Sequence, residues 1–160
     1  MSRGSIAALA VAAVLTGTTP ARADLTGFIG ATTTPENRLT RGFAVGTGLL
    51  VIGWEFEFAH TTDDLTAAAP TLRTFMGNAL LQTPFAIRGF QPYVTTGGGV
   101  YRETLGGRTR TGLAPNTGAG VKISLIGPLR LRVDYRAFRT GSGALYSPAH
   151  RVYAGLNVKF

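Results

Sequence analysis

The last ten residues of the chain alternate between two kinds of side chain. In the segment 151–160 (RVYAGLNVKF) every even position is apolar, and the odd positions carry polar side chains, glycine or tyrosine. A period of two residues is that of a β-strand with one apolar face, because successive side chains of a strand point to opposite sides. A tilted strand needs about 9–11 residues to cross a bilayer. The chain therefore ends in a segment that fits a membrane-spanning strand.

The same period recurs upstream in the segments 52–59, 121–125 and 129–136. A helix would place Glu55 and Phe58 on one stripe and mix charge with the apolar face, so the helical interpretation fails here. The phase is weaker in the segment 72–81, where we assign Asn78 to the polar face.

These patterns predict an all-β fold of eight antiparallel strands. The expected strands are 25–32, 41–46, 50–59, 72–81, 89–103, 117–125, 129–138 and 150–160. The expected long connections are 33–40, 60–71, 104–116 and 139–149, and the expected short ones are 47–49, 126–128 and the intermediate 82–88. Long connections on one side and short turns on the other are typical of an up-and-down transmembrane β-barrel, with the short turns in the periplasm.

Residues 1–23 are interpreted as a cleavable signal peptide, so that the barrel domain is 24–160. Arg3 precedes a ten-residue apolar run, 6–15, which is too short to cross a membrane as a helix. Pro20 is followed by Ala21-Arg22-Ala23, whose small residues at the first and third positions are typical of a cleavage site. We expect export across the inner membrane and location in the outer membrane.

Alternation alone does not tell whether the apolar face contacts lipid or a protein core, and a soluble lipocalin-like barrel would show the opposite sense. Glycine favours the membrane interpretation. Gly53, Gly118, Gly120 and Gly155 all lie on the charged face, where a narrow lumen needs room for long side chains from opposite strands. We therefore place the charges inside and the aromatic side chains outside. The expected apolar belt consists of Phe43, Ile52, Trp54, Phe56, Phe58, Val133, Tyr135, Leu156, Val158 and Phe160.

Three motifs resemble the small outer-membrane β-barrel domain family of Gram-negative bacteria. The C-terminal Tyr153-x-Gly155-x-x-Val158-x-Phe160 is similar to the insertion signal of outer-membrane barrels, the segment 91–101 resembles the family's fifth strand, and 53–57 its third. The resemblance implies an eight-stranded, porin-like barrel without catalytic activity. It also implies that the assembly machinery recognises the chain through Phe160.

The charges of the polar face predict a lumenal network of ion pairs, because opposite charges in a confined lumen satisfy each other. Its expected members are Glu55, Glu57, Lys122, Arg132, Asp134 and Arg136. Glu55 and Glu57 are roughly 7 Å apart on one strand face, a separation that also suits glycoside hydrolysis. A filled lumen leaves no space for a sugar, so we favour the network.

Two histidines and two glycine-rich segments are weaker candidates. His60 and His150, with Ser147 nearby, raise the alternative of a lipid-A-modifying enzyme, but no base is aimed at a nucleophile; we expect solvated loop histidines. The segments 46–48 and 97–99 contain glycines, yet neither opens a helix after a strand as a phosphate loop does.

Arginine makes up most of the positive charge. The chain has 16 basic and 8 acidic residues and no cysteine, which excludes disulfide frameworks and thiol chemistry. Several arginines fall in or beside the expected long loops, where a basic rim would grip lipopolysaccharide phosphates. They are Arg38, Arg41, Arg102, Arg108, Arg110, Arg139 and Arg151, of which Arg102, Arg108, Arg110 and Arg139 are the candidate lipopolysaccharide contacts.

The expected function is structural: envelope integrity, or a surface interaction with lipopolysaccharide or an external ligand. The expected partners are outer-membrane lipids and the assembly machinery. We expect a monomer that binds no nucleic acid and carries no cofactor or metal.

Overall fold

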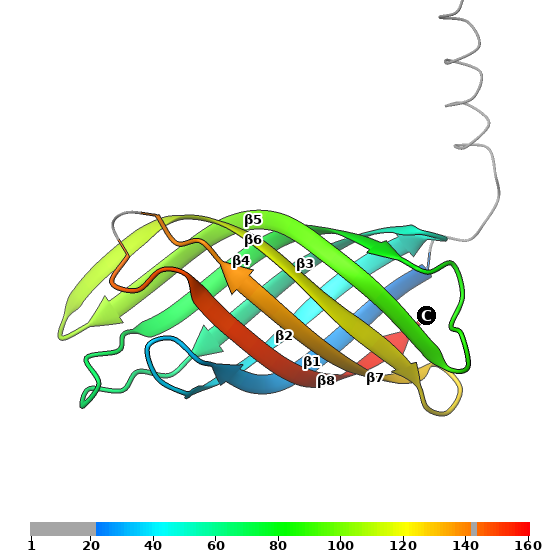
Figure 1. Ribbon diagram of the computed structural model, residues 1–160, viewed down its shortest axis with the longest axis horizontal. Coiled ribbons are helices and arrows are strands. Elements are labelled where there is room, and N and C mark those ends of the chain that lie inside the picture. Colours follow the sequence, from blue (N-terminus) through cyan, green and yellow to red (C-terminus); the bar gives the residue numbers. More distant parts are fainter. Residues whose placement is uncertain (1–21, 142–143) are drawn as a thin grey trace, which may run out of the picture.

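The computed structural model describes residues 22–141 and 144–160 as a closed barrel of eight strands in sequence order (Figure 1). Each strand pairs antiparallel with the next, and β1 closes the barrel against β8. The strands are β1 (Arg22–Thr32), β2 (Arg38–Leu49), β3 (Ile52–Thr61), β4 (Thr71–Gln82), β5 (Phe90–Leu105), β6 (Arg108–Ser124), β7 (Leu129–Phe138) and β8 (Ala149–Lys159). The predicted signal peptide lies outside the described residues, except for Arg22 and Ala23, with which β1 begins.

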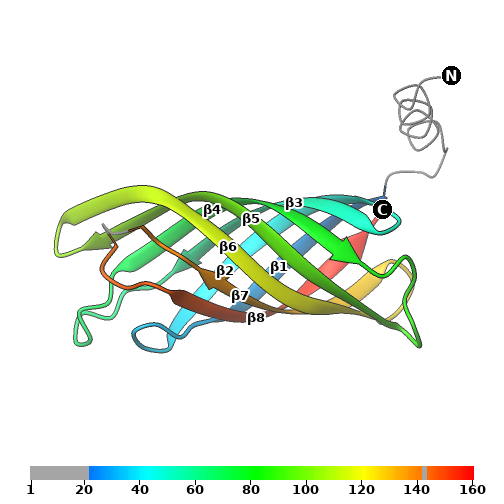
Figure 2. The same cartoon turned by 45° about the horizontal axis from the view of Figure 1, so that its top comes forward.

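The predicted fold class and the number of strands are confirmed, but one predicted connection is wrong. The segment 104–116 is not a long loop: β5 continues to Leu105, β6 begins at Arg108, and two glycines make the turn. Gly106 and Gly107 both have positive φ, +55° and +79°, as the tightest hairpin turns require. The β5–β6 hairpin consequently projects beyond the barrel, at the end away from the C-terminus (Figure 2).

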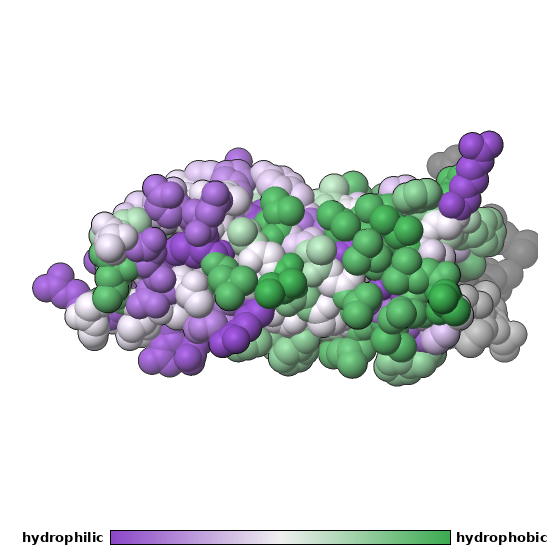
Figure 3. All heavy atoms as spheres, turned by 90° about the horizontal axis from the view of Figure 1, so that it is seen from below, coloured by the Kyte–Doolittle hydropathy of each residue, from purple (hydrophilic) through white to green (hydrophobic). Residues whose placement is uncertain are grey.

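The polar face lies inside and the apolar face outside, as predicted. On β3, Trp54 is 61% exposed while its neighbour Glu55 is 2% exposed. Every residue of the predicted apolar belt is exposed on the outer wall. Figure 3 shows apolar side chains gathered over the part of the barrel near the C-terminus, and polar ones towards the opposite end. This sense of the alternation contradicts the soluble lipocalin-like alternative, in which the apolar residues would be buried.

Glycines on the lumen side make room for larger neighbours. A Cβ atom on Gly120 would overlap the hydroxyl of Tyr93, and one on Gly118 would stand 3.0 Å from Cγ of Arg136. At Gly118 the nearest atom to an added Cβ is the backbone carbonyl oxygen of Tyr135, which it would overlap. A side chain at either position would therefore force its neighbours to move, and the glycines leave room for the tyrosine and the arginine within the lumen.

The alternation of polar and apolar residues is weak along β4 because both of its faces carry apolar side chains. Leu72, Met76 and Leu80 point into the lumen on the same side as Asn78. Towards the extracellular end, Leu72 and Met76 belong to a small buried apolar cluster with Tyr101 and Phe138. The lumen is therefore not uniformly polar, and this strand carries apolar side chains on both faces.

Arg38 closes part of the extracellular mouth, so its assignment to a basic rim is wrong. It is 5% exposed, and its guanidinium donates to the carbonyl oxygens of Thr34 (2.9 Å), Thr62 (3.3 Å) and Pro70. It thereby joins the β1–β2 and β3–β4 connections.

The β3–β4 connection has an internal anchor of its own. Asp64 accepts hydrogen bonds from the Thr66 hydroxyl (2.6 Å) and from the backbone N–H groups of Thr66 (2.9 Å) and Ala67 (3.2 Å). These bonds favour the ionised carboxylate and hold the pKa of Asp64 below its ordinary value, the Thr66 hydroxyl contributing most.

Candidate functional site

The middle of the lumen is filled by a cluster of six charged side chains, which we call the lumenal network. Its members are Glu55 and Glu57 on β3, Arg132, Asp134 and Arg136 on β7, and Arg151 on β8. Their side chains are no more than 1% exposed. Strand alternation places all six on the inner face, and barrel closure brings β3 opposite β7 and β8.

Arg136 is the centre of the lumenal network. Its guanidinium nitrogens lie 2.7 Å from a Glu55 oxygen, 3.1 Å from a Glu57 oxygen and 3.0 Å from an Asp134 oxygen. Arg132 also joins Glu55 to Asp134, the latter at 2.9 Å, and Arg151 contacts Glu57 at 3.1 Å. Three arginines thus face three carboxylates, and the cluster carries no formal net charge. That balance matters because an unpaired charge in this position would cost several kcal/mol.

Two tyrosines that the sequence analysis did not assign to the network complete it. Tyr93 accepts a hydrogen bond from Nε of Arg132 (2.7 Å) and donates to Asp134, while Tyr153 donates to Glu57 at 3.0 Å. Both rings are buried, and the guanidinium of Arg132 lies over each of them. Their position on the polar phase of β5 and β8 was the signal available in the sequence.

Lys122 does not join this cluster. Its Nζ lies 2.7 Å from a carboxylate oxygen of Asp24 on β1, nearer the periplasmic mouth. A cavity of about 210 Å³ opens at this end, and its wall includes Asp24, Lys122 and Glu55. The periplasmic cavity therefore reaches the lumenal network at Glu55.

A second cavity of about 440 Å³ lies at the extracellular end. The β5–β6 hairpin and Leu145 line it, with Glu103, Arg108 and Arg110 among the lining residues. It shares no lining residue with the periplasmic cavity. The fully buried lumenal network occupies the barrel between them.

Glycoside hydrolysis would need both carboxylates at one substrate, but only Glu55 borders one of the two cavities described above. Glu57 is 0% exposed, and each of Glu55 and Glu57 contacts two arginines. In the described part of the chain, no three His, Asp or Glu side chains come together as a metal site. No described residue belongs to a helix long and apolar enough to span a membrane.

The two histidines lie on the outer wall of the strands rather than in loops. Nδ1 of His150 is 2.7 Å from the hydroxyl of Tyr135, and the two rings stack. The hydroxyl beside His150 is therefore that of Tyr135 rather than that of Ser147. His60 lies on β3, beside Arg41 and Arg73 of the neighbouring strands.

The arginines of the predicted rim divide into three groups. Arg151 is buried in the lumenal network, so the rim prediction is wrong for it, as it is for Arg38. Arg108 and Arg110 belong to the β5–β6 hairpin and border the extracellular cavity, with Arg110 opposite Glu103 in the ladder. The other three predicted rim arginines, Arg41, Arg102 and Arg139, are exposed on the outer face.

The two glycine-rich segments are parts of β2 and β5 and form no phosphate loop. Residues 46–48 pair with β1 and β3, and residues 97–99 pair with β4 and β6.

Comparison with family models gives no match, and comparison with curated protein sequences gives none. Solved structures do match. The N-terminal β-barrel domain of Pseudomonas aeruginosa OprF has a TM-score of 0.68 at 14% identity, covering 87% of this chain and 97% of that one. Neisserial surface protein A has a TM-score of 0.64 at 15% identity, covering 88% and 96%. The outer membrane enzyme PagL has a TM-score of 0.50 at 15% identity, covering 86% and 98%.

These similarities define the fold. The chain has the fold of the eight-stranded β-barrels found in the outer membranes of Gram-negative bacteria. One of the similar structures is a β-barrel domain, another is a surface protein and the third is an enzyme. One fold therefore carries different functions, and the function of this chain depends on its own residues.

Proposed function

We propose that this protein is a closed, non-enzymatic barrel of the outer membrane, which supports envelope integrity and contacts lipopolysaccharide at its extracellular end. The observation that carries the proposal is the lumenal network. Arg132, Arg136 and Arg151 are all 0% exposed and paired within the barrel. An interior filled in this way serves stability rather than transport.

Closure of the lumen is tested by conductance. The purified barrel, reconstituted into planar bilayers in 1 M KCl, is expected to give no stable conductance steps. A general diffusion porin in the same bilayers serves as the positive control. Regular open-channel steps from this chain would contradict the proposal.

The envelope role is tested in cells. Deletion of the gene is expected to increase sensitivity to detergents and to large hydrophilic antibiotics, and the wild-type chain is expected to restore resistance. Unchanged sensitivity in the deletion strain would contradict a contribution to envelope integrity.

The proposed contacts with lipopolysaccharide are the predicted rim residues Arg102, Arg108, Arg110 and Arg139. All four are exposed, and guanidinium groups pair with phosphate through two parallel hydrogen bonds. We expect the barrel to act as a monomer.

Assembly is proposed to use the C-terminal signal Tyr153, Gly155, Val158 and Phe160. In the folded barrel Tyr153 and Gly155 are buried in the lumen, whereas Val158 and Phe160 are exposed on the outer wall. Phe160→Ala is expected to lower the amount of inserted, heat-modifiable barrel in cells, and unchanged insertion would count against this role.

A lipid-A-modifying activity is the alternative, since His150 and Tyr135 form a pair on the outer wall. The pair has no serine, and hydrolysis needs a nucleophile aimed by a base. Overexpression is expected to leave lipid A acylation unchanged. A loss of acyl chains that His150→Ala abolishes would establish the enzyme instead.

A further inference from the structure

Four basic side chains stand next to one another on the outer wall of four consecutive strands. In the ladders Arg41 of β2 lies opposite His60 of β3, His60 lies opposite Arg73 of β4, and Arg73 lies opposite Arg102 of β5. All four side chains point outward, because their neighbours along each strand point into the lumen. We call this set the outer basic row.

The three arginines of the outer basic row have no ion-pair partner within the described residues, and the nearby Asp63 acts on His60. Arg41, Arg73 and Arg102 are exposed and form no ion pair there. Glu103 adjoins the row in sequence but points inward, at 5% exposure. Like charges directly opposite each other across a ladder are destabilising, so an anion from outside the chain is needed to offset Arg73 and Arg102.

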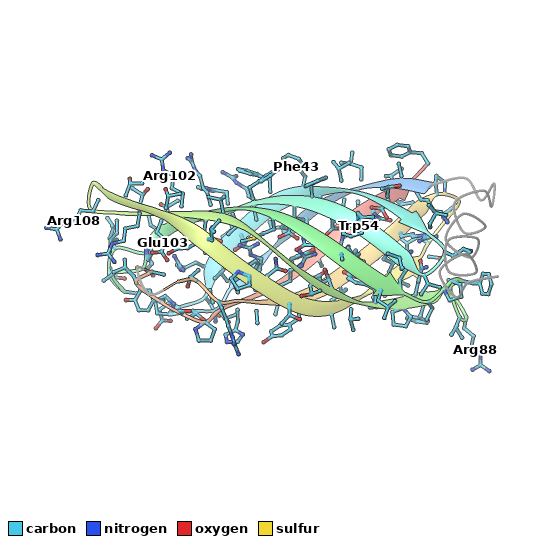
Figure 4. The ribbon with its side chains drawn as sticks, turned by 90° about the horizontal axis from the view of Figure 1, so that it is seen from above. Phe43, Trp54, Arg88, Arg102, Glu103 and Arg108 are labelled. Atoms are coloured by element: carbon cyan, nitrogen blue, oxygen red, sulfur yellow. The ribbon has the colours of Figure 1, made fainter. Side chains whose placement is uncertain are left out.

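On its periplasmic side, the outer basic row is adjacent to a row of large apolar side chains. These are the next outward-pointing residues on the same four strands: Phe43, Phe58, Phe75 and Val100. Phe43 and Phe58 contact each other, with ring centroids 5.8 Å apart. Figure 4 places Arg102 between Phe43 and the hairpin tip at Arg108, along the length of the barrel.

The depth of the row agrees with the edge of a bilayer. From Arg41 to the periplasmic end of β2 at Leu49 the strand covers about 26 Å, or about 20 Å along the axis at a tilt of ~40°. The apolar band of such barrels is about 25 Å tall. A long side chain bridges the remainder by extending its charged end towards the headgroups. The guanidinium group of Arg41 therefore reaches the level of the outer-leaflet headgroups. Because the ladder is perpendicular to tilted strands, Arg102 lies about 9 Å farther from the periplasm than Arg41 (Figure 4), on the headgroup side of the row.

From this geometry we propose that the outer basic row binds the phosphate groups of lipid A, with Arg41, Arg73 and Arg102 as phosphate ligands. Neighbouring strands are about 4.8 Å apart, so the row extends over about 14 Å of wall. This length accommodates two phosphates of one lipid, each held by one or two guanidinium groups. The inference rests on the proposed location in the outer membrane. The row lies on the strand wall and shares Arg102 with the proposed rim contacts, whereas Arg108 and Arg110 of the rim belong to the projecting hairpin.

The test measures binding of bisphosphorylated lipid A to the full barrel in neutral detergent micelles, as the rise in thermal unfolding midpoint. The row variant is R41Q/R73Q/R102Q. The rim variant R108Q/R110Q/R139Q removes the same charge from the proposed rim contacts, and the neutral control is R88Q, because Arg88 is exposed at the opposite end of the barrel. We expect lipid A to stabilise wild type and R88Q equally and to bind the rim variant more tightly than the row variant. The row variant is expected to bind about a hundredfold more weakly than wild type, since each cation near an anionic lipid surface contributes about fivefold.

Two reference lipids and one milder variant make the result decisive. Lipid A without phosphates is expected to give no shift, and R73Q alone is expected to weaken binding about fivefold, which keeps the test valid if the triple variant folds poorly. Wild-type affinity in the row variants would overturn the inference, as would an equal effect of phosphatidylglycerol. Loss of binding only in the rim variant would refute the row while keeping the proposed lipopolysaccharide contact. Absence of binding by the wild type would refute both.

Discussion

The arginines inside the barrel and those on its outer wall lie in opposite environments. Inside, Arg132 and Arg136 are fully buried and contact three carboxylates. Outside, Arg73 and Arg102 are exposed and stand directly opposite each other without a carboxylate. Register alone separates the two cases, since a shift of one residue moves a strand's side chains to the other face. Charge in the lumen is compensated by the protein, and charge on the wall requires compensation by the membrane.

The largest expected effect comes from removing one charged member of the lumenal network. Arg136→Met leaves Glu55, Glu57 and Asp134 short of their shared partner, and we expect a loss of about 3–5 kcal/mol in the free energy of unfolding. The comparison variant Arg73→Gln also removes one positive charge and is expected to change stability by less than about 0.5 kcal/mol in neutral detergent. Denaturant titration in micelles measures both.

A double variant sharpens this contrast. Arg136→Met combined with Glu57→Gln restores the balance of charge in the lumen, and we expect it to recover part of the lost stability. Equal stability losses for Arg136→Met and Arg73→Gln would show that the two environments do not differ as described.

Placing a charge lower on the outer wall is expected to cost somewhat less. Phe56 is 62% exposed, in the middle of the apolar belt. Phe56→Arg is expected to destabilise the barrel in bilayers by about 2–4 kcal/mol, whereas Leu39→Arg, near the extracellular edge, should cost about 0–1 kcal/mol. Folding titrations in lipid vesicles measure the difference, and equal costs would contradict the assigned depth.

The smallest expected effect tests how the lumen is packed. Gly120→Ala would push against the Tyr93 hydroxyl, because the added methyl group would overlap it. We expect a loss of about 1–3 kcal/mol from overpacking and displacement of the tyrosine. Gly27→Ala is the control, because nothing lies within 4 Å of the place its Cβ atom would take. A control as destabilised as Gly120→Ala would remove the packing explanation.

Most of the fold could be predicted because alternation is a local property. The even and odd positions of β3 and β8 separate cleanly and predict strands. The sense of the barrel follows from the glycines on the charged face, such as Gly120 and Gly155. The β5–β6 hairpin was missed although its signal was present: Gly106-Gly107 is a two-residue turn between strand-forming segments.

The sites depend on relations between strands, which alternation does not reveal. Arg151 had the phase of a lumen residue, yet its closeness to the loop expected at 139–149 favoured the rim. The separation of Lys122 from the central cluster and the pairing of Arg73 with Arg102 both follow from barrel closure and register. These quantities are set by the whole sheet rather than by any one segment.

The central claim is that lipid hydrocarbon chains contact the outer wall of the barrel, while the packed lumen admits neither lipid nor water-soluble reagents. Because the chain has no cysteine, single spin labels at Phe75→Cys and Met76→Cys, neighbours on opposite faces of β4, compare the two sides directly. In bilayers, the account predicts that the label at 75 collides frequently with oxygen and rarely with a water-soluble nickel reagent, and that the label at 76 collides little with either. A label at 75 that the nickel reagent reaches freely would contradict the membrane assignment.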